Sequence, residues 1–242
     1  MILNLLHLGR VDYTTGLDLQ RQLVEARLEN RIGNTLLLLE HPPVLTLGRN
    51  SNRSNILATD EFLAYRGVEV HEINRGGDVT YHGPGQLVGY PVLDLRGFTL
   101  GGRRIGAVDY VRLLEEVLIR SLGDFAVPAQ RISGRTGVWT IAGGSAQEKK
   151  VAAIGVHISR GITSHGFALN VTTELRDFEL IVPCGISDRA VTSLELEATA
   201  DAMVPTMENT INAVARQFGR VFEHQVLWLE SDQLPITRAA AR

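Results

Sequence analysis

One cysteine is the residue of this sequence with the clearest capacity for covalent chemistry. Cys184 follows an apolar run and a proline and is followed by a glycine, a pattern that places its thiol on a turn at the end of an element. Because the sequence holds a single cysteine, an intramolecular disulfide and a zinc site of several thiolates are excluded. Two interpretations remain, a buried apolar filler or a reactive thiol.

A reactive thiol needs a base or a cation beside it, because a free thiol with a pKa of about 8.5 is only a few per cent thiolate at neutral pH. Residues 150–158 are predicted to form a strand, and Lys149 and Lys150 at its start point to opposite faces. Only one of these lysines can therefore face a cleft, and two solvated lysines are the alternative. Arginine is excluded as a proton carrier because it does not deprotonate in proteins. The other candidate partners of the thiol are His82, His157 and His165.

A second feature is the glycine-rich segment 75–86, which holds four glycines, one proline and the polar residues Arg75, Asp78, Tyr81 and His82 between two strand-like segments. Glycine lets a backbone approach a ligand closely, and the polar side chains can fix the orientation of a substrate. Glycine and proline residues in such an arrangement also occur in ordinary turns. The segment by itself therefore indicates contact with a ligand but names no reaction.

Four motifs follow one another between about residues 40 and 194. They are residues 75–91, 150–155, 165–170 and 183–185, and residues 41–48 precede them as a strand and turn. In these motifs the sequence resembles the octanoyl-acyl-carrier-protein:protein octanoyltransferases of lipoate biosynthesis. The resemblance implies an acyltransferase that carries out the first step of endogenous protein lipoylation.

The resemblance also implies roles for individual residues. Cys184 would be the acyl-thioester nucleophile, and Lys150 would be its partner, which tunes the thiol and carries its proton. The residues implied to line the acyl site are Arg75, Gly76, Gly77, Asp78, Val79, Thr80, Tyr81, His82, Ala153, Ile154, Gly155, Gly166, Phe167 and Ala168. His165 is a candidate for a supporting hydrogen bond, whereas Asp78 and Tyr81 could anchor the loop instead of meeting substrate. No metal and no cofactor is expected.

The partners implied by the resemblance are two proteins. Octanoyl-acyl carrier protein would donate the acyl group to Cys184 as a thioester. The acceptors would be lysines on the lipoyl domains of 2-oxoacid dehydrogenases and on the H protein of glycine cleavage, whose amine would take the acyl group as an amide. Exchange of one thioester for another is nearly energy-neutral, so the enzyme would supply positioning and charge stabilisation rather than driving force.

Three alternatives stay open at this point. An ATP-dependent lipoate or biotin protein ligase would use a glycine-rich cleft and a lysine but would not need Cys184. A non-catalytic module that binds acyl carrier or lipoyl domains would need neither Cys184 nor Lys150. A thiol hydrolase would use water as the acceptor.

Composition narrows the class of protein further. The 242 residues carry 24 Lys and Arg against 27 Asp and Glu, a net charge of −3, which is unlike the basic field of a nucleic-acid-binding protein. No apolar run approaches a bilayer span and no export signal opens the sequence, so no membrane contact and a cytoplasmic location are expected. Because acyl carrier proteins are acidic, a local basic surface is expected from the pairs Arg49 and Arg53, Arg103 and Arg104, and Arg131 and Arg135.

The elements that must position these residues are mostly strands. Strands are predicted at residues 2–8, 36–40, 44–47, 68–74, 87–95, near 130, and at 137–142, 150–158 and 162–171; helices are predicted at 15–32, 60–65, 105–122 and 207–223, with Gly33 ending the first helix. Many consecutive strands with few helices indicate an α+β fold with a mixed, largely antiparallel sheet packed by helices. The resemblance implies the fold of biotin and lipoate protein ligase catalytic domains. We expect one catalytic domain over residues 1–242, with frayed last residues.

Overall fold

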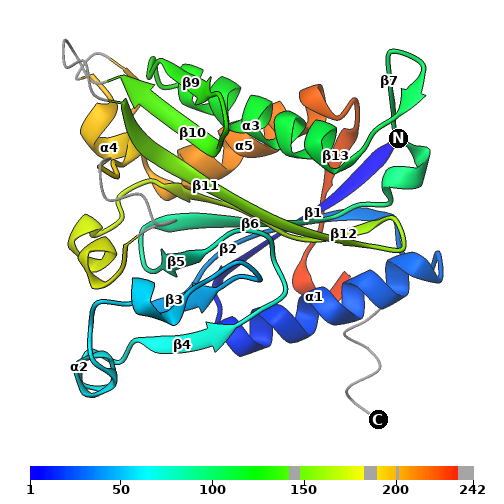
Figure 1. Ribbon diagram of the computed structural model, residues 1–242. Coiled ribbons are helices and arrows are strands. Elements are labelled where there is room, and N and C mark those ends of the chain that lie inside the picture. Colours follow the sequence, from blue (N-terminus) through cyan, green and yellow to red (C-terminus); the bar gives the residue numbers. More distant parts are fainter. Residues whose placement is uncertain (142–147, 183–189, 200–201, 234–242) are drawn as a thin grey trace.

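The computed structural model describes residues 1–141, 148–182, 190–199 and 202–233. Its centre is an eight-stranded sheet of mixed direction (Figure 1). In spatial order the strands are β13 (Gln225–Trp228), β1 (Ile2–Arg10), β2 (Asn34–Glu40), β6 (Gln86–Val92), β12 (Ile162–Asn170), β11 (Glu148–Ser159), β10 (Arg135–Ile141) and β9 (Ala129–Ile132). β1 pairs in parallel with β2 and β13, and the other neighbours pair antiparallel. The predicted class, a mixed and largely antiparallel sheet packed by helices, is confirmed.

Helices cover both faces of this sheet. α3 (Ala107–Gly123) and α5 (Met207–Val221) pack on one face, and α1 (Tyr13–Leu28) packs on the other (Figure 1). The run of four leucines in β2 shows the consequence: Leu36 and Leu38 join the core under α3 and α5, whereas Leu37 and Leu39 join the core under α1. A strand that is buried on both faces is hydrophobic at every position instead of at alternate ones.

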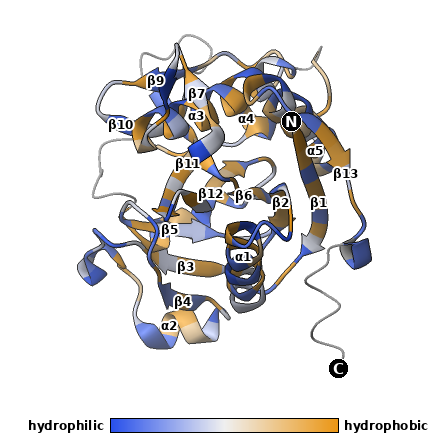
Figure 2. Cartoon of the chain, turned by 90° about the vertical axis from the view of Figure 1, so that its right-hand side faces the viewer, coloured by the Kyte–Doolittle hydropathy of each residue, from blue (hydrophilic) through white to orange (hydrophobic). Residues whose placement is uncertain are grey.

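A second, three-stranded sheet carries the glycine-rich segment. Its order is β4 (Glu69–Glu72), β3 (Val44–Leu47) and β5 (Val79–His82), with α2 (Asp60–Tyr65) beside it. β5 pairs antiparallel with β3, so the middle of the glycine-rich segment is itself a strand. In Figure 2, β3 is coloured mainly as hydrophobic, as expected for a strand whose residues are all buried.

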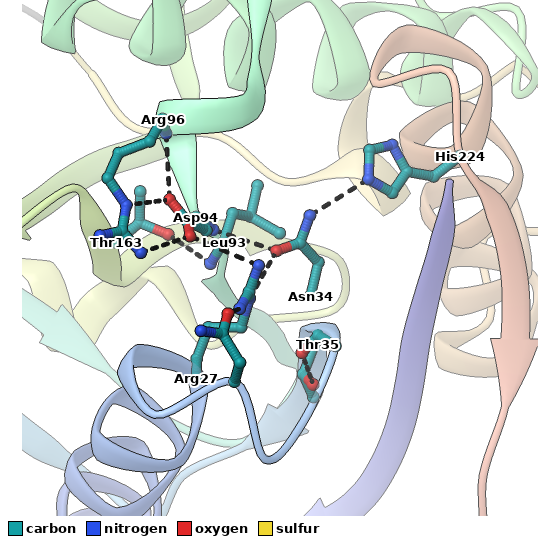
Figure 3. Close-up of polar contacts among 10 residues, drawn as sticks. Arg27, Asn34, Thr35, Leu93, Asp94, Arg96, Thr163 and His224 are labelled. Carbon is teal, nitrogen blue, oxygen red and sulfur yellow. Dashed lines mark hydrogen bonds and ion pairs between the residues drawn. The ribbon is translucent and has the colours of Figure 1, made fainter.

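A buried amide joins the elements at one end of the large sheet. Asn34 at the start of β2 accepts hydrogen bonds from Arg27 Nε (3.1 Å) and from the main-chain N–H of Asp94 (3.0 Å). Its Nδ2 lies 3.2 Å from Nε2 of His224, which precedes β13 (Figure 3). One side chain thus ties α1, the end of β6 and the last strand of the sheet together.

The first helix ends earlier than the sequence indicates. It stops at Leu28 because Asn30 adopts a left-handed conformation (φ 57°) and the N–H of Arg31 bonds back to the carbonyl of Ala26. Gly33 is therefore not the residue that ends the helix. The sequence prediction also missed β5, β13, the hairpin of β7 (Thr99–Leu100) and β8 (Arg103–Arg104), and α4 (Leu194–Glu197). Over the described residues, every helix is too short or too polar to cross a bilayer.

Candidate active site

A cavity of about 280 Å³ opens where the two sheets meet. Its walls come from the start of α1, the glycine-rich segment and strands β6, β10, β11 and β12. The predicted site residues that line it are Arg75, Gly77, Asp78, Val79, Thr80, His82, Lys150, Ala153, Ile154, Gly155, His165, Gly166, Phe167 and Ala168. Residues far apart in the sequence are therefore brought to one cavity, and Gly76 and Tyr81 are the described members of the predicted set outside its wall.

Tyr81 is turned away from the cavity. Its side chain is 1% exposed and its hydroxyl donates to Asp177 Oδ2 at 2.7 Å, inside the core of the small sheet. Alternation along β5 then leaves Thr80 and His82 on the cavity side. Of the two roles that the sequence left open for Tyr81, this position favours the anchor of the glycine-rich segment over contact with substrate.

Gly76 and Gly155 hold the glycine-rich segment against β11. The N–H of Gly76 donates to the carbonyl of Val156 at 2.9 Å. A Cβ at Gly155 would lie 2.8 Å from the carbonyl oxygen of Gly76 and 3.0 Å from Cδ of Arg75, closer than a real Cβ approaches. Glycine at 155 is required by this close approach, and Gly76, which lies outside the cavity wall, binds the glycine-rich segment to β11.

Arg75 places a buried positive charge in the cavity wall. The side chain is 8% exposed, and its Nη2 donates to both the carbonyl (2.7 Å) and the hydroxyl (2.9 Å) oxygens of Thr46. Nη1 donates to the carbonyl of Gly76 at 3.1 Å. The guanidinium therefore supports the loop and also acts on the titratable groups around it.

The histidines of this region are held neutral. Burial, reinforced by the neighbouring His41 and Arg75, lowers the pKa of His82 to about 3. Burial, reinforced by Arg75 and His157, lowers the pKa of His165 to about 4. His41, which contacts the Tyr90 hydroxyl at 2.7 Å, has its pKa lowered to about 4 mainly by burial. At neutral pH these rings exchange hydrogen bonds without carrying charge.

A chain of amides fixes the tautomer of His82. Gln86 Nε2 donates to the carbonyl of Tyr81 (3.2 Å), so Gln86 Oε1 must face His82 Nδ1, 2.7 Å away. His82 therefore carries its proton on Nδ1 and keeps a lone pair on Nε2. Gln86 Nε2 also donates to Asn170 Oδ1 (2.9 Å), and Asn170 Nδ2 donates to the carbonyl of Thr192 (2.9 Å). The glycine-rich segment is thus tied to the chain at Thr192.

Lys150 reaches the cavity from β11. It lies directly opposite Trp139 of β10, and its Nζ is 5.4 Å from the centroid of the indole ring, within cation–π range. Lys149 points to the other side, where its Nζ lies 3.4 Å from Glu197 Oε1. The structure thus places one of the two lysines in the cavity and pairs the other with a carboxylate.

Cys184 lies outside the described residues. The described chain on either side of it is anchored near the cavity: the N–H of Val182 donates to the carbonyl of Asn55 at 2.7 Å, and the carbonyl of Ala190 accepts from the N–H of Lys150 at 3.0 Å. The N–H of Thr192 donates to the carbonyl of Lys150 at 2.9 Å. The chain that follows residue 189 therefore runs beside Lys150.

Several cavity residues were missed from sequence. Tyr13, Val88, Tyr90, Arg135 and Trp139 all line the cavity. The alternation of side chains within motif 75–91 could have indicated Val88 and Tyr90. Tyr13 gives no sequence signal, because it reaches the cavity only through the packing of α1 on the sheet. No group of three or more metal-ligating side chains occurs in the described part of the chain.

Three of the six arginines of the expected basic surface are paired with carboxylates. Arg53 pairs with Asp60 at 2.7 Å and Arg103 pairs with Asp109 at 2.7 Å. Arg131 pairs with carboxylates of α3, and Arg135 faces the cavity.

Comparison with known proteins places the chain in a family. Residues 12–219 match the family model of the lipoyl protein ligase A/B catalytic domain. An octanoyltransferase of Acidobacterium capsulatum is 75% identical over 97% of both chains, and an octanoyltransferase of Koribacter versatilis is 56% identical over 97% of this chain and 90% of its own.

Solved structures show the same fold at low identity. A bipartite lipoate protein ligase of Thermoplasma acidophilum superposes with a TM-score of 0.73 at 16% identity, covering 100% of this chain and 91% of its own. A biotin protein ligase of Aquifex aeolicus superposes with a TM-score of 0.51 at 18% identity, covering 91% of this chain and 70% of its own. The chain therefore belongs to the lipoyl protein ligase A/B catalytic domain family and, within it, to the octanoyltransferases, as its motifs predicted.

Proposed function

We propose that this chain, acting as a single catalytic unit, transfers an octanoyl group from acyl carrier protein to a lysine of a lipoyl domain through a thioester on Cys184. The observation that carries the proposal is the pairing of a lysine amine with an acyl-sized cavity. Lys150 enters the cavity beside the chain that leads away from Cys184, and its partner in sequence, Lys149, is diverted to Glu197. Relatives named octanoyltransferase are 75% and 56% identical to it over the aligned residues.

The cavity wall is long enough for the proposed acyl group and offers it apolar side chains. An extended octanoyl chain spans roughly 9 Å from its carbonyl carbon to its methyl, at about 1.25 Å per carbon–carbon bond. Lys150 and Ile154 are separated by about 13 Å along β11, at roughly 3.3 Å per residue. The apolar side chains of Val88, Ile154, Phe167 and Ala168 form part of the wall. A carbonyl near Lys150 would therefore leave the acyl tail among apolar groups.

The first half-reaction loads the enzyme. Lys150 in its neutral form accepts the proton of the Cys184 thiol, and the thiolate attacks the thioester carbonyl. A bond forms between the Cys184 sulfur and the acyl carbon, and the bond from that carbon to the carrier sulfur breaks. Lys150 returns the proton to the departing carrier thiolate.

The second half-reaction transfers the acyl group from the enzyme to the acceptor. The amine of the acceptor lysine attacks the acyl carbon, Lys150 takes the proton that the amine loses, and the bond to the Cys184 sulfur breaks. The proton then returns to the thiolate, so the enzyme leaves the cycle unchanged. The product is an amide, which is more stable than the thioester, and this step supplies the driving force.

The partners and compartment belong to this proposal. We take acyl carrier protein as donor, and the lipoyl domains of 2-oxoacid dehydrogenases and the glycine cleavage H protein as acceptors. A structural neighbour is described together with its E2 lipoyl domain, which supports an acceptor of that kind. A free nucleophilic thiol is most easily kept reduced in the cytoplasm, which supports that location.

Intact-protein mass spectrometry tests the first half-reaction. Enzyme mixed with octanoyl-acyl carrier protein, without ATP, should gain the mass of one octanoyl group, and C184A should gain none. K149A serves as the matched control for K150A, because it removes the neighbouring amine on the opposite face. Acylation of C184A at the wild-type rate, or a requirement for ATP, would overturn the proposal and favour a ligase.

A further inference from the structure

An irregularity in β10 lies directly against Lys150. Between Arg135 and Trp139, β10 advances four residues while its neighbour β9 advances two, from Ile132 to Gln130. The register against β11 also shifts, between Val138 and Trp139. Such bulges re-aim side chains and recur beside active sites.

Gly137 lies in the middle of this bulge, between Arg135 and Trp139. Its φ of 124° lies in the region that favours glycine, and a Cβ there would stand 2.7 Å from both Lys150 Cε and the carbonyl oxygen of Ala152. The Lys150 stem therefore lies against the backbone of Gly137. Because Trp139 follows two residues later and faces Lys150, the bulge sets both surfaces that the lysine contacts.

A buried carboxylate of α3 accepts a hydrogen bond from the backbone of the bulge. Glu115 of α3 is 0% exposed, and its Oε1 accepts the N–H of Gly137 at 3.1 Å. Its Oε2 accepts from Arg112 Nη1 at 2.6 Å and from Arg131 Nε at 3.1 Å. A charge buried under a helix is costly, and an apolar side chain of similar volume often stabilises such a position equally well. Stability alone therefore gives little reason for a carboxylate here.

We infer that Glu115 is a positioning residue for the acyl-transfer reaction: through the N–H of Gly137 it fixes the β10 bulge and so holds the Lys150 amine in place. This inference rests on the proposed role of Lys150. A displacement of about 1 Å at a reacting group can cost about a hundredfold in rate. A residue that acts on Lys150 through one neighbour, Gly137, can therefore change the reaction rate.

Two substitutions and one matched control separate positioning from packing. E115L removes the acceptor and keeps most of the volume, whereas E115Q keeps an oxygen that can accept the Gly137 N–H. Glu116 is the control, because it shares the partner Arg131 (2.7 Å) but is bound to Arg120 and not to Gly137. E116Q therefore removes charge beside the same arginine and leaves the bulge alone.

Two readouts report on the bulge and on the reaction. The chain has two tryptophans, so W228F leaves Trp139, which is 1% exposed, as the only one, and its emission reports on the wall beside Lys150. The single-turnover rate of Cys184 acylation by octanoyl-acyl carrier protein, with its dependence on carrier concentration, reports on the chemistry. Both are measured well below the thermal midpoint of each variant.

We expect E115L to lower the limiting acylation rate by about 30- to 100-fold with little change in half-saturation, and to shift Trp139 emission to the red. E115Q should fall between E115L and wild type, and E116Q should stay within about twofold of wild type. E115L with unchanged emission and a rate within about threefold of wild type would overturn the inference and leave the proposed function standing.

Two further results complete the test. Acylation of K150A at the wild-type rate would instead overturn the proposed role of Lys150, whatever Glu115 does. If E115L does not fold, G137A decides, because its added Cβ displaces the Lys150 stem without changing Glu115. A wild-type rate in G137A would overturn the inference, and a rate lowered by about 30- to 100-fold would support it.

Discussion

The buried histidines around the cavity should make this protein unstable in mild acid. His41, His82 and His165 have folded-state pKa values of about 4, about 3 and about 4, because burial disfavours their charged forms. In the unfolded chain each returns to a pKa near 6.5. Between these values the unfolded state binds protons that the folded state does not. Their contribution is therefore fully present above about pH 6.5 and is lost as pH falls below it.

The size of the loss follows from these pKa values. For one histidine that titrates at 6.5 when unfolded and at 4 or below when folded, moving from pH 7 to pH 5 lowers the free energy of unfolding by about 2 kcal/mol. Three such groups could lower it by roughly 5 kcal/mol, a large part of the 5–15 kcal/mol typical of a domain. Asp109, whose pKa is lowered to about 2 by its hydrogen bond from Arg103, stays charged in this range. Burial also lowers the pKa values of His157 and His224, so these two histidines change stability in the same direction over this interval.

The assay is urea unfolding at pH 7 and pH 5, compared between wild type and H165N. Asparagine suits position 165 because His165 has φ 53°, a left-handed conformation that asparagine tolerates. H165N should lose about 2 kcal/mol less than wild type between the two pH values, with an unchanged urea slope. An equal loss in both proteins would show that His165 is not held neutral by burial.

Three other substitutions have expected outcomes. Y81F removes the hydrogen bond to Asp177 and should lower the free energy of unfolding by about 1–2 kcal/mol, measured by urea unfolding, while acyl transfer continues at a near wild-type rate; a selective loss of activity would return Tyr81 to the acyl site. G155A brings a Cβ to 2.8 Å from the Gly76 carbonyl and should reduce acylation, followed by mass spectrometry, far more than it reduces the melting temperature. F167A enlarges the apolar end of the cavity and should raise the rate with dodecanoyl relative to octanoyl carrier protein, at a stability cost of about 3 kcal/mol; an unchanged ratio would show that Phe167 does not limit chain length.

The sequence predicts the frame of this protein well because long elements carry strong periodic signals. The apolar stripe of α3 and the continuous leucines of β2 report burial on one face or on two, and both elements lie within two residues of their predicted bounds. β13 has four residues and pairs with a strand more than two hundred residues away, so local pattern alone could not show it.

The candidate site likewise contains residues that the sequence indicates and residues that it does not. Glycines whose absent Cβ permits close backbone approach, such as Gly155, are visible as motifs. The direction of the Tyr81 side chain cannot be predicted from the sequence, because it depends on which face of β5 meets the large sheet. Glu115 gives only a weak signal: in sequence it stands at helical spacing with Val111 and Leu118, and only the fold shows that it meets Gly137 across the core.

The pairing of Lys150 with Cys184 is tested most directly by the rate of Cys184 acylation across pH in K150A and in K149A. We expect K150A to be slower by about two to four orders of magnitude at pH 7, because it lacks a positioned proton carrier. Its rate should then rise with pH as the thiol ionises unaided, while K149A follows the wild-type profile. A K150A profile that coincides with that of wild type, or a K149A defect as large as that of K150A, would contradict the pairing.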